Sequence, residues 1–504
     1  MTAFLERLGD RVNPIVVKET RQAVNSRLVG AFLLLFLTVQ LVVMLIMIAD
    51  NESAAPEDFD LRAGRDVFMA VQGILVGTCL VLIPTMTSVR LATERSDGNT
   101  DLLFISSLTP RAVLAGKLIA AGALALLIFS ACAPFMTFAY VMRGLDVPTI
   151  LVVLFADFLT VLLATAFGLF LASVPANRGF RIVLGLGGAL GMCYLGAGLV
   201  ALSAAFLRGE TSLETDSWEF WAACAGLAAL VFGTIGQLFV WSVALISPPS
   251  SNRMFPVRVY ALGLWVAEAV GFGAWSLSIG RPEPMVIWGV LGCALFSLHL
   301  VMAVSERDEW GTRVRARIPR RPLLRPLAFL LYSGAAGGIA FGVLGAALTA
   351  LGLVVWVLFF PHTRLSSEEK VVPVLALIAA YTYCYCLTAA LVRRAIGPNL
   401  LRAGHTWIVA GLLFGLGSTL PFIASFALFE PYERRGSPSD MIALYLTSPV
   451  VTIADAMRRH ETHVAITVFF LAAWGAVVTM ANAPWLARQV RDFRPPQARA
   501  EAGE

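Results

Sequence analysis

Charged residues are scarce in this chain of 504 residues, because Lys, Arg, Asp and Glu make up only 14% of it. An ordinary soluble protein has about 25%. Hydrophobic residues reach 58%, and this composition excludes a water-soluble globule. Because one bilayer-crossing helix needs roughly 20 apolar residues, the sequence predicts an all-α polytopic integral membrane protein with about a dozen spanning helices.

Motifs for catalysis and nucleotide binding are missing as well. Gly116-Lys117 is followed by Leu118 and lacks the upstream glycine of a phosphate-binding loop, so the chain is not expected to bind ATP itself. No Gly-x-Ser-x-Gly nucleophile motif occurs. His460 and His463 stand three residues apart, whereas a zinc-protease helix needs His-Glu-x-x-His, so we interpret them as part of a polar loop. We expect no catalytic residue, metal or cofactor in this chain.

The small excess of positive charge also says little about a soluble partner. Lys and Arg total 38 against 33 Asp and Glu, which gives a net charge of +5. Basic loops on the cytoplasmic side of a membrane explain such an excess better than a nucleic-acid partner does. All 7 cysteines fall in apolar runs, where small packing residues are the ordinary interpretation.

Apolar runs of sufficient length predict twelve membrane spans. They lie near 28–49, 67–89, 113–141, 149–173, 182–207, 218–246, 258–279, 285–304, 327–360, 371–392, 405–429 and 463–486.

The charges of the loops predict the topology. The N-terminal 27 residues are basic, 50–66 is acidic, and 90–112 is basic again, so both termini are expected in the cytoplasm. The plasma membrane, most simply a bacterial cytoplasmic membrane, is the expected location. The predicted regions are a cytoplasmic interfacial helix in 1–27, a first six-span membrane domain in 28–246, a cytoplasmic linker in 247–257, a second six-span region in 258–486, and a cytoplasmic tail in 487–504.

Two segments of the second region need separate interpretation. The loop 305–326 is the most basic of the chain, and we interpret it as an anchor at lipid headgroups, with a docking surface for a soluble protein as the alternative. Segment 441–456 is apolar but short and is interrupted by Pro449, so we expect a re-entrant segment on the extracytoplasmic side. Ser305-Glu306-Arg307 faintly mirrors Thr93-Glu94-Arg95, but the residues that follow do not match, which leaves an internal duplication open.

Ionisable residues deep in the apolar runs are few. Asp157 lies in the fourth predicted span and Glu268 in the seventh. Such residues usually face a cavity or a partner, because exposure of a charge to lipid is costly. They are either structural polar contacts or residues lining a substrate path, and an ion- or proton-coupled secondary transporter would be centred on them.

Two segments in predicted cytoplasmic regions carry more specific patterns. The first begins at Asn13, which can cap a helix, and Pro14, which suits a first helical turn, and it predicts an interfacial helix before the first span. The second, 94–117, begins with a charged turn broken at Gly98, continues as a short amphipathic stretch, and restarts at Pro110.

Together these segments resemble the ABC-2 type permeases, the membrane subunits of one class of ATP-binding-cassette transporters. The interfacial-helix pattern is carried by Asn13, Pro14, Lys18, Glu19 and Arg21. The pattern after the second span is carried by Glu94, Arg95, Gly98, Thr100 to Leu103, Leu108, Pro110, Arg111, Gly116 and Lys117. Leu446-Thr447-Ser448-Pro449 weakly resembles the re-entrant helices of these permeases, whereas twelve spans are twice the usual six, so two fused domains and inserted helices both stay open.

The resemblance implies a mechanism as well as a fold. A separate cytoplasmic ABC ATPase would bind ATP and dock on the membrane protein, and segment 94–109 would couple hydrolysis to the export of a substrate. The implied ATPase contacts are Glu94, Arg95, Asp97, Leu102, Leu103 and Phe104, supported by the interfacial helix. A homodimer and a second permease chain are both open, and membrane lipid is a further partner. The alternatives are the secondary transporter described above and a non-transporting membrane scaffold.

Overall fold

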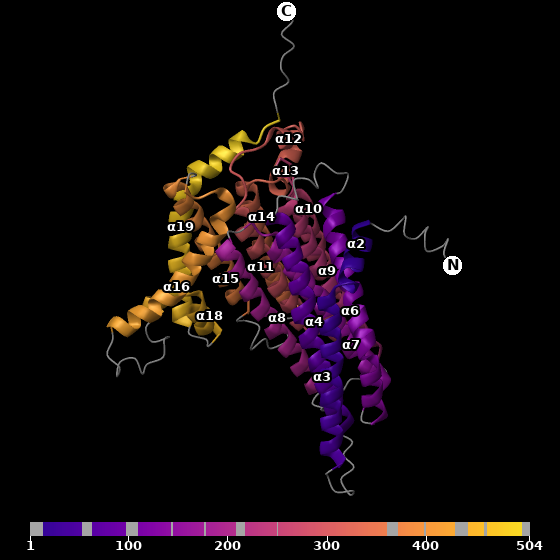
Figure 1. Cartoon of the computed structure of the whole chain (residues 1–504). Helices are drawn as coiled ribbons and strands as arrows, with labels where there is room; N and C mark the ends of the chain where they lie inside the picture. Colours follow the sequence, from indigo (N-terminus) through magenta and orange to yellow (C-terminus); the bar gives the residue numbers. More distant parts are fainter. Residues whose placement is uncertain are drawn as a thin grey trace, which may run out of the picture. The chain divides into compact units, whose positions relative to one another are not determined.

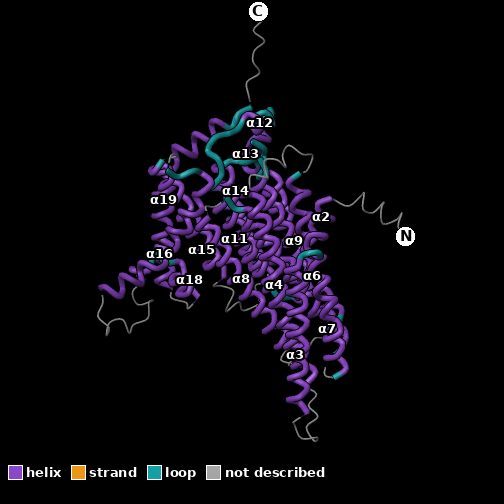
Figure 2. The backbone as a smooth tube through the Cα atoms, in the orientation of Figure 1, coloured by secondary structure: helices purple, strands orange, loops and turns teal. Residues whose placement is uncertain are grey.

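The computed structural model describes eleven stretches of the chain. They are residues 14–52, 63–96, 109–142, 145–175, 178–207, 217–248, 250–359, 371–397, 400–428, 442–457 and 461–495. These stretches contain helices and connecting loops and no strand (Figure 2). Twelve of the helices are long and apolar enough to cross a membrane, which confirms the all-α polytopic fold. The protein is an integral membrane protein.

The chain divides into two compact units, Met1–Ser247 and Pro248–Glu504, and six of the twelve long helices lie in each (Figure 1). The helices of unit 1 are α2 (Pro14–Val24), α3 (Arg27–Glu52), α4 (Ala63–Ser96), α6 (Pro110–Val141), α7 (Val147–Ser173), α8 (Arg178–Leu207) and α9 (Trp218–Ile246). Those of unit 2 are α10 (Phe255–Ile279), α11 (Glu283–Ala303), α12 (Thr312–Arg315), η1 (Pro322–Leu324), α13 (Arg325–Leu331), α14 (Ala335–Phe359), α15 (Val371–Ile396), η3 (Ala403–His405), α16 (Thr406–Leu428), α17 (Ile442–Tyr445), α18 (Pro449–Met457) and α19 (Glu461–Asp492).

Each unit is built around its second and fourth long helices. In unit 1, α4 packs against α3, α6, α7 and α8, and α7 also packs against α6, α8 and α9. In unit 2, α11 packs against α10, α14, α15 and α16, and α15 also packs against α14, α16 and α19. The same order of helices along the chain thus produces the same neighbours in both units.

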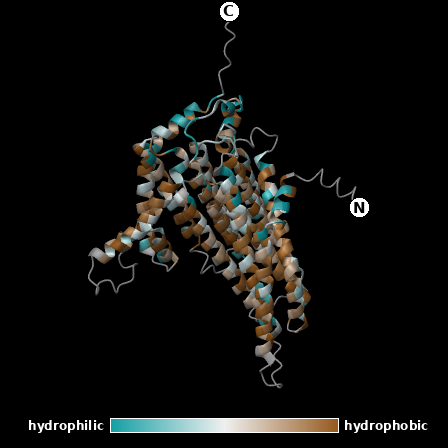
Figure 3. Ribbon diagram, in the orientation of Figure 1, coloured by the Kyte–Doolittle hydropathy of each residue, from teal (hydrophilic) through white to brown (hydrophobic). Residues whose placement is uncertain are grey.

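The cores of the two units are packed in different ways. In unit 1, α4 contributes large buried side chains to a core shared with α6 and α7, including Phe68, Leu75 and Ile83. In unit 2, α14 approaches α11 closely because it carries glycines on the facing side. A Cβ added at Gly345 would lie 2.1 Å from a ring carbon of Phe296. Small residues at an interface allow this approach in membrane helices. The hydropathy colouring shows the apolar residues spread along the long helices (Figure 3).

One predicted boundary is wrong. The sequence predicts a single span over 327–360, but α13 ends at Leu331 and α14 begins only at Ala335. The break has a tertiary cause: the Ser333 N–H donates to Asn252 Oδ1 at 2.8 Å, and the Gly334 N–H donates to Glu306 Oε2 at 2.5 Å. These backbone donors are therefore unavailable for a continuous helix. The other predicted spans differ from the observed helices mainly at their ends.

Candidate functional site

Three helices of unit 1 bring charged residues together at one end of the unit. We define the unit-1 corner as Glu19 of α2, Arg90 and Glu94 of α4, and Lys117 of α6. Lys117 Nζ donates to Glu19 Oε1 at 2.7 Å and to Glu94 Oε1 at 3.0 Å. Arg90 Nη1 lies 3.8 Å from Glu19 Oε2. One lysine therefore ties the helix before the first span to the end of the second span and the start of the third.

Local sequence explains why these helices meet. Pro14 begins α2, and Thr109 caps α6 by accepting a hydrogen bond from the Ala112 N–H at 3.3 Å. Gly116 then allows α2 to lie directly on α6, since a Cβ added there would lie 2.6 Å from Ile15 Cγ2. The residue after this close approach is Lys117. The Gly-Lys pair therefore works as a helix contact followed by an ionic tie.

Burial makes this corner sensitive to charge. The side chains of Lys117 and Glu19 are only 2% and 7% exposed, whereas those of Glu94 and Arg90 are about one-third exposed. Removing one member of a buried ion pair leaves an unpaired charge, which costs far more than removing both members. The corner is thus a rigid, charge-balanced joint with a more open side toward Glu94 and Arg90.

The other residues predicted for this site divide into three groups. Arg95 Nη1 donates to the carbonyl of Ala172 at 3.0 Å, so Arg95 fastens the end of α4 to the end of α7. Lys18 and Arg21 are exposed on α2. The remaining predicted residues lie outside the described part of the chain; they are Asn13, Asp97, Leu102, Leu103 and Phe104.

The two carboxylates considered for ion coupling lie in different units. Asp157 of α7 is fully buried, and Gln72 Nε2 of α4 donates to its two oxygens at 3.1 and 3.2 Å. The same amide donates to Ser203 Oγ of α8 at 3.0 Å, so Asp157 belongs to a polar contact among three helices. Glu268 is half-buried on α10 of unit 2. Asp157 is therefore held by hydrogen bonds within unit 1, and its role in a substrate path stays a prediction.

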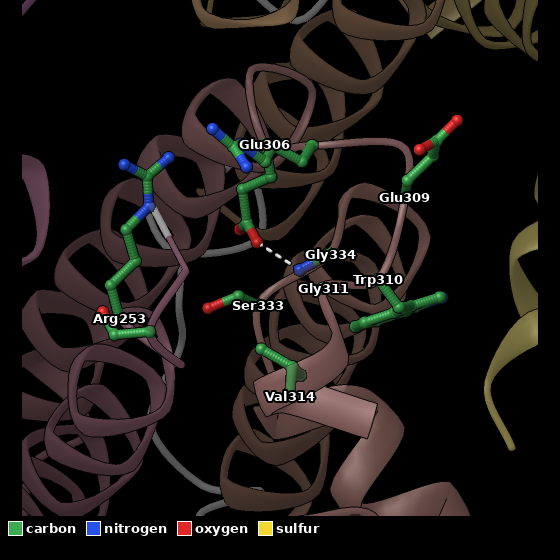
Figure 4. A pocket seen from close by; sticks show the side chains of 10 residues that line it. Arg253, Glu306, Glu309, Trp310, Gly311, Val314, Ser333 and Gly334 are labelled. Carbon is green, nitrogen blue, oxygen red and sulfur yellow. Dashed lines mark hydrogen bonds between the residues drawn. The ribbon is translucent and has the colours of Figure 1, made fainter. Parts of the chain in front are cut away.

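Unit 2 has its own charged corner, which sequence analysis missed. We define the unit-2 corner as Arg258 of α10, Glu306 after α11, and the N–H of Gly334 before α14. Glu306 forms an ion pair with Arg258 and accepts from Gly334, as Figure 4 shows for the second contact. Arg258 and Glu306 are 1% and 4% exposed. Burial raises the pKa of Glu306, and the charge of Arg258 opposes this shift.

The short helices α17 and α18 form a turn that enters unit 2 and leaves it again. Tyr385 lies about halfway along α15, and its hydroxyl donates to the carbonyl of Thr447 at 2.5 Å. Thr447 Oγ1 donates at 3.1 Å to the carbonyl of Gly417, the middle of α16. Tyr381 donates in the same way to Leu446 at 2.7 Å. The turn thus packs against the middles of α15 and α16, and the tyrosines satisfy carbonyls that lipid could not. This packing fits the re-entrant segment that the sequence predicts.

The sequence contains signals for some of the unit-2 residues that sequence analysis missed. Arg258 stands inside an apolar run, and a buried arginine needs a carboxylate, of which Glu306 is the nearest beyond the next helix. Tyr381 and Tyr385 occupy one face of a helix, but nothing in the sequence shows that segment 442–457 folds against them. Among the described residues, no three His, Cys, Asp or Glu side chains gather in a way that could hold a metal ion.

Comparisons of the chain with protein-family models, curated proteins and solved structures find no match. The function has to be argued from the chain's own residues.

Proposed function

We propose that this chain is the permease subunit of an ABC transporter of the ABC-2 type, an exporter driven by a separate ATPase. The supporting observation is the unit-1 corner. Glu19, Glu94 and Lys117 come from the two sequence segments that resemble this family, and they meet in one ionic joint although Glu19 and Lys117 are 98 positions apart in the chain. In this proposal the corner lies on the cytoplasmic side of the plasma membrane, and so do both termini.

The joint is placed where force from a cytoplasmic partner would enter the bundle. Glu94 and Lys117 flank segment 97–108 and are bonded to each other, and Lys117 is also bonded to Glu19 of α2. A displacement of that segment would therefore move the end of α4 and the start of α6 together. Because α4 packs against four other long helices of unit 1, its movement would rearrange the whole unit. The chain needs no chemical step of its own, since the partner would bind and hydrolyse ATP.

Segment 97–108 would itself supply the contact with the ATPase. Leu102, Leu103 and Phe104 give it apolar side chains among charged ones, and buried apolar anchors usually dominate the energy of a protein interface. Glu94 and Arg95 make contacts within unit 1, so their role in this proposal is to fix the start of the segment rather than to bind the partner directly.

The test uses the chain co-expressed with its ATPase, which this proposal expects to be encoded beside its gene. Replacing Leu103 and Phe104 by Ala should weaken co-purification of the ATPase, or uncouple its hydrolysis from transport, while the protein still inserts into the membrane. The matched control replaces Arg315 and Arg317 of the basic loop in unit 2 by Ala. Normal coupling in the first variant and loss in the second would show that the wrong loop has been chosen.

A further inference from the structure

A polar pocket lies beside the unit-2 corner (Figure 4). Its walls come from three stretches of the chain: 251–253 before α10, 306–314 after α11, and 333–334 before α14. All three stretches adjoin ends of long helices. The pocket therefore lies beside the ends of candidate spanning helices, and such ends are where lipid headgroups and solvent meet.

Arg253, Arg307, Glu306 and Glu309 line this pocket, and the charge of Glu306 is already paired with Arg258. Glu306 is engaged by Arg258 and by the Gly334 N–H, and Glu309 is exposed and points away from Arg253 and Glu306 in Figure 4. Arg253 is half-buried and makes no hydrogen bond to the described part of the chain, and Arg307 is exposed at the rim. Burial lowers the pKa of Arg253; the charge of Glu306 opposes this shift, and the charge of Arg307 has a smaller lowering effect. An anion bound beside the two guanidinium groups would stabilise their charged forms.

We propose that this pocket binds a phosphate group through Arg253 and Arg307. A guanidinium presents paired N–H donors that match two oxygens of a phosphate, and such charge-assisted hydrogen bonds are stronger than neutral ones. Ser251 and Ser333 also line the pocket and add hydroxyl groups near the same opening.

The phosphate can come from an anionic lipid or from a soluble phosphate compound. The surroundings favour the lipid, because η1 and α13, which follow on the same loop, expose Leu323, Leu324 and Leu327. α13 packs against α10, which begins two residues after Arg253. Apolar side chains beside basic ones are typical of a segment that lies in the membrane interface.

The experiment is a titration of the purified full-length chain, first stripped of lipid in detergent, followed by native mass spectrometry. The probes are phosphatidylglycerol, phosphatidylcholine and inorganic phosphate. The parent chain should retain one phosphatidylglycerol more tightly than any phosphatidylcholine. Arg253→Gln and Arg307→Gln should each lower that affinity about tenfold, the size expected for loss of a charge-assisted hydrogen bond. Arg253→Lys should lower the affinity for phosphatidylglycerol less than Arg253→Gln does.

The matched control is Arg313→Gln, which removes the same charge from an exposed position of the same loop outside the pocket and should leave binding unchanged. If Arg253→Gln fails to fold, the rim variant Arg307→Gln decides alone. Binding of inorganic phosphate that is lost in Arg307→Gln, without any preference for phosphatidylglycerol over phosphatidylcholine, would support the site. The ligand would then be a soluble phosphate compound. Equal binding in Arg307→Gln, Arg313→Gln and the parent, or no binding of either phosphate probe, would overturn the proposal.

Discussion

The two units arrange their long helices alike but join the ends of these helices with different residues. Glu94 lies near the end of the second long helix of unit 1, and Glu306 follows the end of the second long helix of unit 2. The partner of Glu94 is Lys117 on the third helix, whereas the partner of Glu306 is Arg258 on the first. A carboxylate is therefore kept at equivalent places, and its cation comes from different helices.

The short helices beside these corners differ in the same way. In unit 1, α2 precedes the first long helix and packs against α6 and α3. In unit 2, α13 comes from the loop between the second and third long helices, and it packs against the equivalent pair, α14 and α10. In both units a short helix thus packs against the first and third long helices. These two short helices come from different parts of the sequence.

The loop after the second long helix is an integral part of unit 2. Trp310 packs between Phe329 of α13 and Phe493 after α19, and its Nε1 donates to the carbonyl of Gln489 at 3.2 Å. A loop fastened to α13 and to the end of α19 is poorly suited to being moved by a partner. Similar helix packing in the two units therefore need not mean that their loops have the same role. For this reason we assign coupling with the ATPase to unit 1.

The largest effect is expected in the unit-2 corner. Glu306→Ala leaves Arg258 buried without its carboxylate, which should lower the free energy of unfolding by about 3–5 kcal/mol. Thermal unfolding of the purified chain in detergent measures this loss. Arg258→Met combined with Glu306→Leu removes both charges and should restore most of the stability. A Glu306→Ala variant as stable as the parent would show that this ion pair does not stabilise unit 2.

The second effect concerns function rather than stability. Lys117→Met leaves Glu19 and Glu94 facing each other without the lysine between them, so the contact of α2 with α4 and α6 should loosen. Substrate-stimulated hydrolysis by the partner ATPase should fall about fivefold or more, the lower range of typical coupling energies. Lys117→Arg, which keeps the charge, should retain most of the substrate-stimulated hydrolysis. Substrate-stimulated hydrolysis as high in Lys117→Met as in the parent would show that the unit-1 corner takes no part in coupling.

The smallest effect is expected at Asp157. Asp157→Asn can keep a hydrogen bond with Gln72, so stability should change by less than about 1 kcal/mol. Transport should stay independent of the proton gradient in this variant, in Glu268→Gln and in the parent. Transport by the parent that an uncoupler abolishes while ATP is held constant would favour the ion-coupled alternative.

Much of the fold could be predicted from the sequence, because membrane spans are defined by length and apolarity alone. The boundary at Tyr332 to Gly334 could not, since it depends on Asn252 and Glu306, which are distant in the chain. For the site, the resemblance pointed to both segments that meet in the unit-1 corner. It did not show that Glu19 would be buried against Lys117, because that contact depends on α2 folding back over Gly116.

The central claim is that the segment after α4, and not its counterpart in unit 2, contacts the ATPase. A photo-crosslinking amino acid placed at position 104 tests it directly in membranes that contain both proteins. The matched position is 323, where Leu323 is 91% exposed on the corresponding loop of unit 2. We predict an ATPase crosslink from position 104 and none from position 323. A crosslink from position 323 alone would contradict the account.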